Sequence, residues 1–409
     1  MAGHYVRLLT PDEHRAAAQV VAQGMLGSVA DEVADAWTAT WKPEECHGAF
    51  TGEDRLVGTA RWFADEVSVP GASLPAAGIT AVAVLSTHRR QGHLSRLMAA
   101  ELDHIHRAGV PMATLVAAEW PIYGRFGYGP AMDACAYEID SAAARFRDPA
   151  TGSIELVGPA ELRPHLEAVH TRRWERTPGS LRRAPHTWDH LAGLTRWPND
   201  PTDPGMLRGA VWRDQDGAVR GAVSYKVTDT WVRNRPAGKV ETIMLVGETP
   251  EAERELWRHL CEIDWATTVV GGLRAVDDPL PLFLTDGRVA AQIARSDAIW
   301  ARILDVPATF AARRAPIAGH AVVEVDDDLG YAAGRWAIAL GPDAGSADST
   351  TEAAEVRVTA GALAAVYFGG QSPRRLFDAG WITELAPGAV DRLTTLLATP
   401  QAPWSTTSY

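Results

Sequence analysis

The sequence is poor in cysteine and has no long apolar run. Its three cysteines, Cys46, Cys135 and Cys261, lie far apart and without a CxxC spacing, which argues against a disulfide framework and a thiolate metal site. No window reaches the ~20 apolar residues of a membrane span. The N-terminus, MAGHYVRLLTPDEHR, carries charges where a signal peptide needs an apolar core. We therefore expect a soluble, cytoplasmic protein without a membrane span.

Positive charge is also scarce. The chain has 39 Lys and Arg against 51 Asp and Glu, a net charge of -12, and its only lysines are Lys42, Lys226 and Lys239. No basic run is longer than two residues, whereas binding to phosphate backbones needs a basic face. This pattern argues against a nucleic-acid partner and is compatible with cationic or amine-bearing small molecules.

The chain has enough apolar residues for several cores. It has 409 residues, of which 46% are hydrophobic, and two or three domains are expected at this length. A pattern of strand, proline and helix occurs at 6–15 (VRLLTPDEHR) and again at 154–163 (IELVGPAELR), about one domain apart. We predict an α/β (α+β) chain with two related units at 1–145 and 146–298, joined by a linker at 140–153, and a third domain at 299–409.

The first unit contains the clearest run of predicted elements. Apolar strands are expected at 55–70, 78–85 and 112–120, and an amphipathic helix at 92–106. A strand, a crossover helix and a second strand predict a βαβ unit with parallel strands. A short helix is expected at 121–127, within PIYGRFGYG.

The turn THRRQG, at 87–92, lies between a predicted strand and the predicted helix. The first N–H groups of a helix lack intrahelical partners and lie at the positive end of its dipole, so they favour a pyrophosphate. Arg89 and Arg90 can add charge-assisted contacts, and Gly92 lets the backbone approach closely. The Lys-Ser/Thr pair of a P-loop is missing, so a magnesium nucleotide is not expected.

Two longer segments carry a family resemblance. VAVLSTHRRQGHLSRLM, at 82–98, and IYGRFGYGPA, at 122–131, resemble the enhanced intracellular survival (Eis) family of GNAT N-acetyltransferases. The resemblance implies two tandem GNAT-like units followed by a domain similar to sterol carrier protein. It also implies acetyl-CoA as co-substrate, no metal, and a homo-hexamer. The residues that match the family's acetyl-CoA site are Val82, Ala83, Val84, Arg89, Arg90, Gln91, Gly92, His93 and Leu94; Leu94 replaces a small residue.

The resemblance further implies a catalytic pair. Tyr123 matches the general acid that protonates the departing thiolate, and a phenol can do so if it lies within hydrogen-bond reach. Tyr128 is expected in the core. The base is the chain's own C-terminal carboxylate, on Tyr409, and its low reference pKa of about 3.5 requires desolvation or a relaying water. The expected acceptor side consists of Trp37, Ala81, Glu119 and Ser408.

The expected activity is direct acetyl transfer, in a ternary complex, to a primary amine. The acceptor is an aminoglycoside-like antibiotic, another amine-bearing metabolite or drug, or a lysine side chain. In the second unit, Glu248, Glu251 and Glu253 occupy the turn that corresponds to THRRQG. We expect these carboxylates to repel a diphosphate, which leaves one active site per chain. The alternative is a non-catalytic protein that binds acetyl-CoA and an apolar ligand of the third domain.

Overall fold

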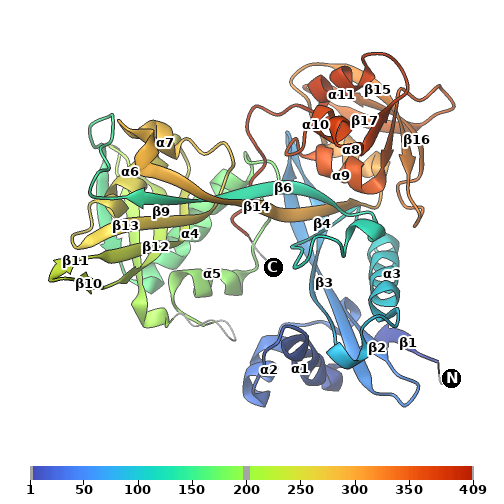
Figure 1. Cartoon of the computed structure of the whole chain (residues 1–409), viewed down its shortest axis with the longest axis horizontal. Coiled ribbons are helices and arrows are strands. Elements are labelled where there is room, and N and C mark those ends of the chain that lie inside the picture. The colour runs from blue at the N-terminus through green and yellow to red at the C-terminus, as the bar shows by residue number, and fades with distance from the viewer. Residues whose placement is uncertain (1–2, 197–202, 408–409) are drawn as a thin grey trace.

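The first two units share one sheet. The computed structural model describes residues 3–196 and 203–407. The sheet has twelve strands in the order β1-β2-β3-β4-β5-β14-β6-β13-β12-β9-β8-β7 (Figure 1). The elements of the N-terminal unit are β1 (Tyr5–Leu8), α1 (His14–Gly24), α2 (Asp31–Thr38), β2 (Cys46–Phe50), β3 (Leu56–Val69), β4 (Ala72–Val84), α3 (His93–Arg107), β5 (Met112–Leu115) and β6 (Gly129–Asp140).

The predicted βαβ unit is confirmed, because β4 and β5 pair in parallel and α3 connects them. The strand expected at 112–120 ends earlier, at Leu115, and the chain is exposed by Ala118. The expected short helix at 121–127 is a 3-10 turn over Gly124–Phe126.

The second unit begins after the predicted linker, between the end of β6 at Asp140 and the start of β7 at Ser153. It repeats the parallel arrangement, with α6 connecting the parallel strands β12 and β13. Its elements are β7 (Ser153–Val157), α4 (Pro159–Trp174), α5 (Pro185–Ala192), β8 (Leu207–Arg213), β9 (Val219–Thr228), the hairpin of β10 (Trp231–Val232) and β11 (Arg235–Pro236), β12 (Gly238–Gly247), α6 (Pro250–Cys261), β13 (Ala266–Arg274), α7 (Leu280–Phe283) and β14 (Ala290–Ile303).

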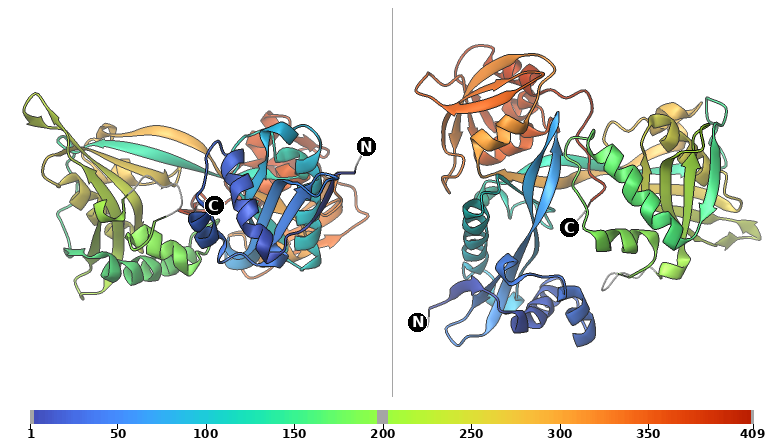
Figure 2. Two further views of the ribbon diagram at one scale, coloured as in Figure 1. Left: turned by 90° about the horizontal axis from the view of Figure 1, so that it is seen from below. Right: turned by 180° about the vertical axis from the view of Figure 1, so that it is seen from behind.

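Two long strands join these units. Strand β14 lies between β5 and β6 and is antiparallel to both, while β6 also pairs with β13. Each unit therefore completes its sheet with a strand that reaches into the other (Figures 1 and 2). The boundary expected after residue 298 falls inside β14, which continues to Ile303 because its last residues are buried in the first unit beside β5.

The third domain has a separate five-stranded sheet in the order β17-β16-β15-β18-β19. Its helix α9 is buried along its whole length and approaches β6 closely: a Cβ on Gly129 would lie 1.8 Å from the Gly361 carbonyl oxygen. The elements are α8 (Val306–Ala312), β15 (Gly319–Asp326), β16 (Gly334–Leu340), β17 (Gly345–Ser349), β18 (Val356–Thr359), α9 (Ala360–Tyr367), α10 (Pro373–Asp378), β19 (Ile382–Glu384) and α11 (Ala389–Leu397).

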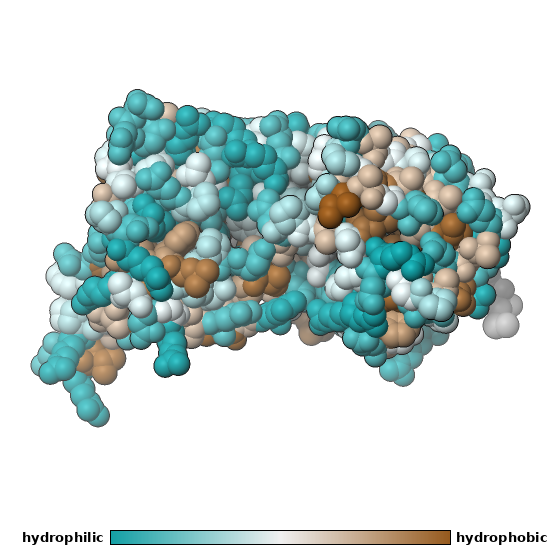
Figure 3. Space-filling view, turned by 90° about the horizontal axis from the view of Figure 1, so that it is seen from above, coloured by the Kyte–Doolittle hydropathy of each residue, from teal (hydrophilic) through white to brown (hydrophobic). Residues whose placement is uncertain are grey.

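The surface gives no sign of a broad apolar face on the side shown in Figure 3. That side is mostly hydrophilic, and its hydrophobic residues form small, separate patches. Within residues 3–196 and 203–407, no helix combines the length and the apolar character that a membrane crossing requires.

Candidate active site

The site is built around a bulge in β4. Between the pairs Thr59–Ala83 and Arg61–Thr80, two residues of β4 oppose one residue of β3, and Ala81 takes a positive φ of 52°. The Thr59 hydroxyl donates to the Ala81 carbonyl at 2.7 Å and fixes the bulge. On its other edge β4 pairs with β5 only from Ala76 to Gly78. Past Gly78 the two parallel strands separate, so within the part of the chain that the structure describes, the backbone of 82–84 has no β-sheet partner on that edge.

The turn after β4 leads into α3 with an unsatisfied helix N-terminus. Gly92 is the N-cap with φ 81°, and among the described residues no side-chain cap bonds to the first N–H groups of α3. Arg90 also has a positive φ, 63°, and Arg89, Arg90, Gln91 and Gly92 are exposed. Arg89 also donates to the Gly24 carbonyl at 3.4 Å. The turn thus exposes N–H groups and two arginines, the chemistry that a diphosphate requires.

A third guanidinium, on Arg96, was missed by sequence reasoning. A Cβ on Gly92 would lie 3.8 Å from Arg96 Nη1, and that nitrogen donates to the Gln91 carbonyl at 3.3 Å. The signal in the sequence is its spacing: a residue four positions after the N-cap lies one helical turn along the same face. Arg96 brings a further positive charge to the turn.

His93 and Leu94 contribute differently from the rest of the turn. The His93 ring is 2% exposed and meets the His4 ring edge-on at 4.6 Å. Burial, helped by the charges of His4, Arg96 and His88, lowers its pKa. Leu94 is half-buried and packs in the cluster that contains Tyr123. Any contact of His93 with an exposed ligand is therefore through its backbone.

Tyr123 lies beside the separated strands. Its side chain is 7% exposed and belongs to one cluster with Ile79 of β4, Met98 of α3 and Trp300 of β14, against which Val82 also packs. Burial, and secondarily the charge of Glu119, raises the pKa of Tyr123 to about 12, so its phenol stays protonated at neutral pH.

Tyr128 is a core residue, as predicted. Its ring is 1% exposed and lies 6.0 Å from the Tyr123 ring, and its hydroxyl has no hydrogen-bond partner. Burial raises its pKa well above the ordinary value. Of the two tyrosines, Tyr123 is the one beside the exposed turn and Glu119.

On the opposite side of β4, aromatic residues cover the bulge. Trp37 of α2 packs against a cluster that includes Ala81, Ala83 and Trp41, and its ring meets the Trp41 ring at 5.4 Å. Of the expected acceptor residues, Trp37 packs against the cluster that contains Ala81, while the exposed Glu119 lies on the Tyr123 side. Ser408 and Tyr409 lie outside the described residues.

Comparisons with known proteins cover the whole chain. Residues 5–131 and 179–303 each match an acetyltransferase (GNAT) domain, and residues 306–406 match a sterol carrier protein domain. An uncharacterized N-acetyltransferase of Streptomyces griseus is 37% identical over 98% of both chains. The N-acetyltransferase Eis of Mycobacterium tuberculosis is 34% identical over 79% of this chain and 78% of its own. This chain belongs to the Eis-like GNAT N-acetyltransferases.

The structure of Eis1 from Mycobacterium abscessus agrees with this Eis-like assignment, with a TM-score of 0.86, 30% identity and 100% coverage of both chains. A GCN5-related N-acetyltransferase from Anabaena variabilis has the same fold at 20% identity, with a TM-score of 0.86. The predicted family and fold class are confirmed. Membership in a GNAT family implies acetyl-CoA as the acyl donor and favours an enzyme over the non-catalytic alternative.

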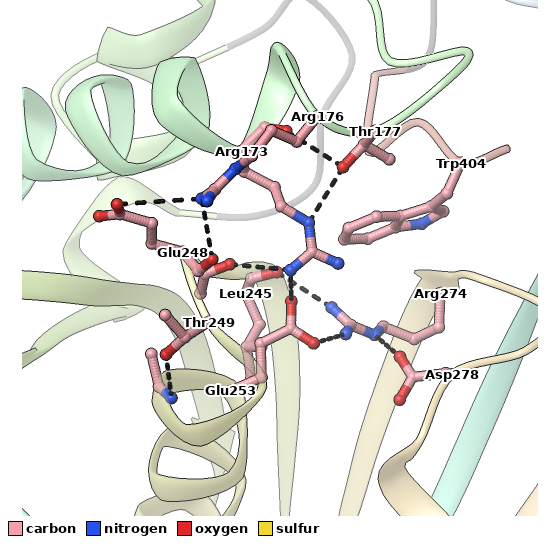
Figure 4. Close-up of polar contacts among 12 residues, drawn as sticks. Arg173, Arg176, Thr177, Leu245, Glu248, Thr249, Glu253, Arg274, Asp278 and Trp404 are labelled. Atoms are coloured by element: carbon pink, nitrogen blue, oxygen red, sulfur yellow. Dashed lines mark hydrogen bonds and ion pairs between the residues drawn. The ribbon is translucent and has the colours of Figure 1, made fainter. Parts of the chain in front are cut away.

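The second GNAT unit of this Eis-like chain has the same strand–turn–helix segment with opposite charge. Glu248 forms ion pairs with Arg172 at 2.6 Å and with Arg220 at 3.1 Å. The Thr249 side chain caps α6 by accepting from Ala252 N at 3.2 Å, and Figure 4 shows Thr249 at the start of this helix. Sequence reasoning expected carboxylates that repel a diphosphate but missed the arginines that hold them. The turn is thus satisfied from within the protein.

Proposed function

We propose that the first unit binds acetyl-CoA and transfers its acetyl group to a primary amine. The observation that carries this proposal is the turn after β4, where the N–H groups that begin α3 lie beside Arg89, Arg90 and Arg96, and none of the carboxylates in 3–196 and 203–407 forms an ion pair with these arginines. These groups would hold the diphosphate. The unpaired edge of β4 at Val82, Ala83 and Val84 would hold the pantetheine arm.

The bulge supplies the groups for catalysis. When bound, acetyl-CoA supplies an activated acyl group. The main-chain N–H groups of Val82 and Val84 would orient its carbonyl and stabilise the negative charge that develops on the oxygen. Attack by the amine, in a ternary complex, needs no covalent intermediate on the protein.

Tyr123 is the proposed general acid. Its raised pKa keeps the phenol protonated, and it packs in the same cluster as Val82 of the bulge. A thiolate in the same apolar surroundings is also poorly solvated and so more basic, which favours transfer of the phenolic proton to it.

The C-terminal carboxylate of Tyr409 is the proposed base. The described tail supports this: Thr407 Oγ1 lies 3.5 Å from the Leu181 carbonyl, and Leu181 bridges to Val67 on β3 of the first unit. The tail up to Thr407 thus reaches β3, the strand that pairs with the bulged strand β4. Desolvation would raise the basicity of the carboxylate.

The acceptor class is an amine on a small molecule or a lysine. Trp37 beside Ala81, together with Glu119 and Ser408, would form its surroundings. The proposal includes aminoglycoside-like antibiotics among the acceptors, and hence a role in antibiotic resistance. It also includes a cytoplasmic location and assembly into a hexamer.

The test follows thiol release from acetyl-CoA with a panel of amines. Tyr123→Phe is expected to lower kcat 100-fold or more, on the order of a full general-acid contribution, and removal of Ser408 and Tyr409 to lower it further. Neither change should weaken acetyl-CoA binding, measured by calorimetry. Tyr128→Phe is the matched control and should retain activity. Full activity after both changes would remove the catalytic assignment.

A further inference from the structure

The C-terminal tail is anchored on the second unit. After α11 it leaves the third domain and runs between the first two units (Figures 1 and 2). Gln401 Nε2 donates to the Arg176 carbonyl at 3.0 Å, and Ala402 N donates to Asp277 Oδ2 at 2.7 Å. Further on, Arg183 donates to Thr406 Oγ1 at 2.7 Å. Residues 401–406 are therefore hydrogen-bonded to the second unit.

Trp404 is the largest buried side chain of the C-terminal tail. It is 4% exposed, its N donates to the Pro178 carbonyl at 2.9 Å, and its indole N–H donates to the Leu273 carbonyl. Two guanidinium groups lie against the ring, Arg274 at 4.8 Å and Arg173 at 5.6 Å from its centroid. Such contacts are strongest when the cation is desolvated.

Those guanidinium groups are themselves fixed. Arg274 is 3% exposed and pairs with Glu253 at 2.8 Å and Asp278 at 2.6 Å, and Arg173 lies 3.5 Å from Glu253 (Figure 4). Glu253 is in the first turn of α6. The part of the second unit that corresponds to the diphosphate turn thus holds, through Glu253, the two arginines against which Trp404 packs.

The tail is also directed toward the first unit. Gly179 N donates to the Ser68 carbonyl and Arg182 N to the Glu66 carbonyl, so 179–182 runs antiparallel to β3. From Trp404 at Pro178 to Thr406 at Arg183, the tail follows this segment. It advances toward the lower-numbered end of β3, where Arg61 pairs beside the bulge.

We propose that Trp404 is a positioning residue: held between Arg274 and Arg173, it fixes the tail so that the C-terminal carboxylate acts on the amine bound in the first unit. This inference rests on the proposed base. It gives the second unit a role in the reaction, because the arginines that Glu253 holds anchor the segment that carries the proposed base.

The test is a double-mutant cycle on the full-length protein, using Trp404→Ala, removal of residues 408–409, and both together. Trp404→Ala is expected to lower kcat on the order of 100-fold, the cost of misplacing a catalytic group, and the truncation to lower it more, with the acetyl-CoA Kd unchanged in both. Because both act through the same carboxylate, Trp404→Ala should add no further loss in the truncated protein. Trp231 is an exposed tryptophan of the second unit, and Trp231→Ala should have wild-type kcat.

The outcomes separate the two claims. If truncation leaves kcat unchanged, the proposed base is wrong and this inference falls with it. If truncation lowers kcat but Trp404→Ala does not, or the two losses multiply, only the positioning role of Trp404 is overturned. Should Trp404→Ala fail to fold, Trp404→Phe and Trp404→Leu replace it. The ring of Phe should preserve most of kcat, and Leu, which fills space without a π face, should not; equal activity of the two would overturn the proposal.

Discussion

The two GNAT units contain the same strand–turn–helix motif, but different groups satisfy its turn. In both, a bulged strand leads through a turn into a helix and then to a parallel strand: β4, α3 and β5 in the first unit, β12, α6 and β13 in the second. In the first, Gly92 leaves the helix N-terminus without a side-chain cap, beside the exposed Arg89, Arg90 and Arg96. In the second, Thr249 caps the helix and Glu248 forms ion pairs with Arg172 and Arg220.

This difference shows that ligand binding here depends on what is left unsatisfied. A helix N-terminus always offers N–H groups and a positive potential. Where side chains of the protein satisfy these groups, as around Glu253 and Arg274, the same turn only packs against the rest of the protein. Where no side chain does, the site stays available to an external anion.

The largest effect is expected from giving the first turn a carboxylate of its own. The three nearest atoms to a Cβ on Gly92, apart from its chain neighbours, belong to the Arg96 guanidinium at 3.8–3.9 Å, and Asp tolerates a positive φ. Gly92→Asp should therefore fold, pair with Arg96 as Glu248 does with Arg172, and repel the diphosphate. A charge at ~4 Å in a partly screened site costs about 4 kcal/mol, so acetyl-CoA affinity should fall about 1,000-fold by calorimetry.

Gly92→Asn is the matched control, since it has the same shape and φ tolerance without the charge. It should lose much less affinity than Gly92→Asp. Equal losses would mean that the turn tolerates only glycine for steric reasons, and the charge comparison between the units would fail.

Local patterns predicted the first turn well. The strand, the turn with Arg89, Arg90 and Gly92, and the following helix are encoded within a short stretch, so spacing and residue type suffice. Arg96 was missed although it lies in the same stretch, because its contact with Gln91 depends on a side-chain conformation. The core position of Tyr128 and the turn that carries Tyr123 were also predictable from the local sequence.

Contacts between distant segments were not predictable. The exchange of β6 and β14 between units depends on pairing over more than a hundred residues, and an internal repeat suggests two closed units instead. The partners of Glu248, namely Arg172 and Arg220, come from α4 and β9. The docking of Trp404 on Arg274 joins the chain end to β13. No spacing rule connects such positions.

The helices after the two turns offer a second comparison, of intermediate effect. Each buries a carboxylate, but Glu255 of α6 pairs with Arg254 and Arg258, whereas Glu101 of α3 faces His47 at 3.2 Å. Burial raises the pKa of Glu101 from 4.5 to about 7. Between these values the folded protein binds more protons than the unfolded chain, so stability falls as the pH rises.

Chemical unfolding at several pH values tests this directly. Glu101 is expected to reduce the free energy of unfolding by about 2 kcal/mol from pH 5 to pH 7. Glu101→Gln should remove this slope, while Glu255→Gln should keep it and destabilise the protein throughout the range. An unchanged slope in Glu101→Gln would show that the carboxyl titrates normally in the fold.

The smallest effects are expected from single arginines of the first turn. Arg89→Gln, Arg90→Gln and Arg96→Gln each remove one charge that is partly exposed to solvent, so each should weaken acetyl-CoA binding about tenfold, or about 1.4 kcal/mol. The losses should shrink at high salt because exposed charges are screened. Arg233→Gln, in the distant β10–β11 turn, is the control for net charge. If Arg96→Gln binds acetyl-CoA as well as wild type while the other two variants do not, Arg96 only stabilises Gln91. The positive charge that distinguishes the first turn from the second would then come from Arg89 and Arg90 alone.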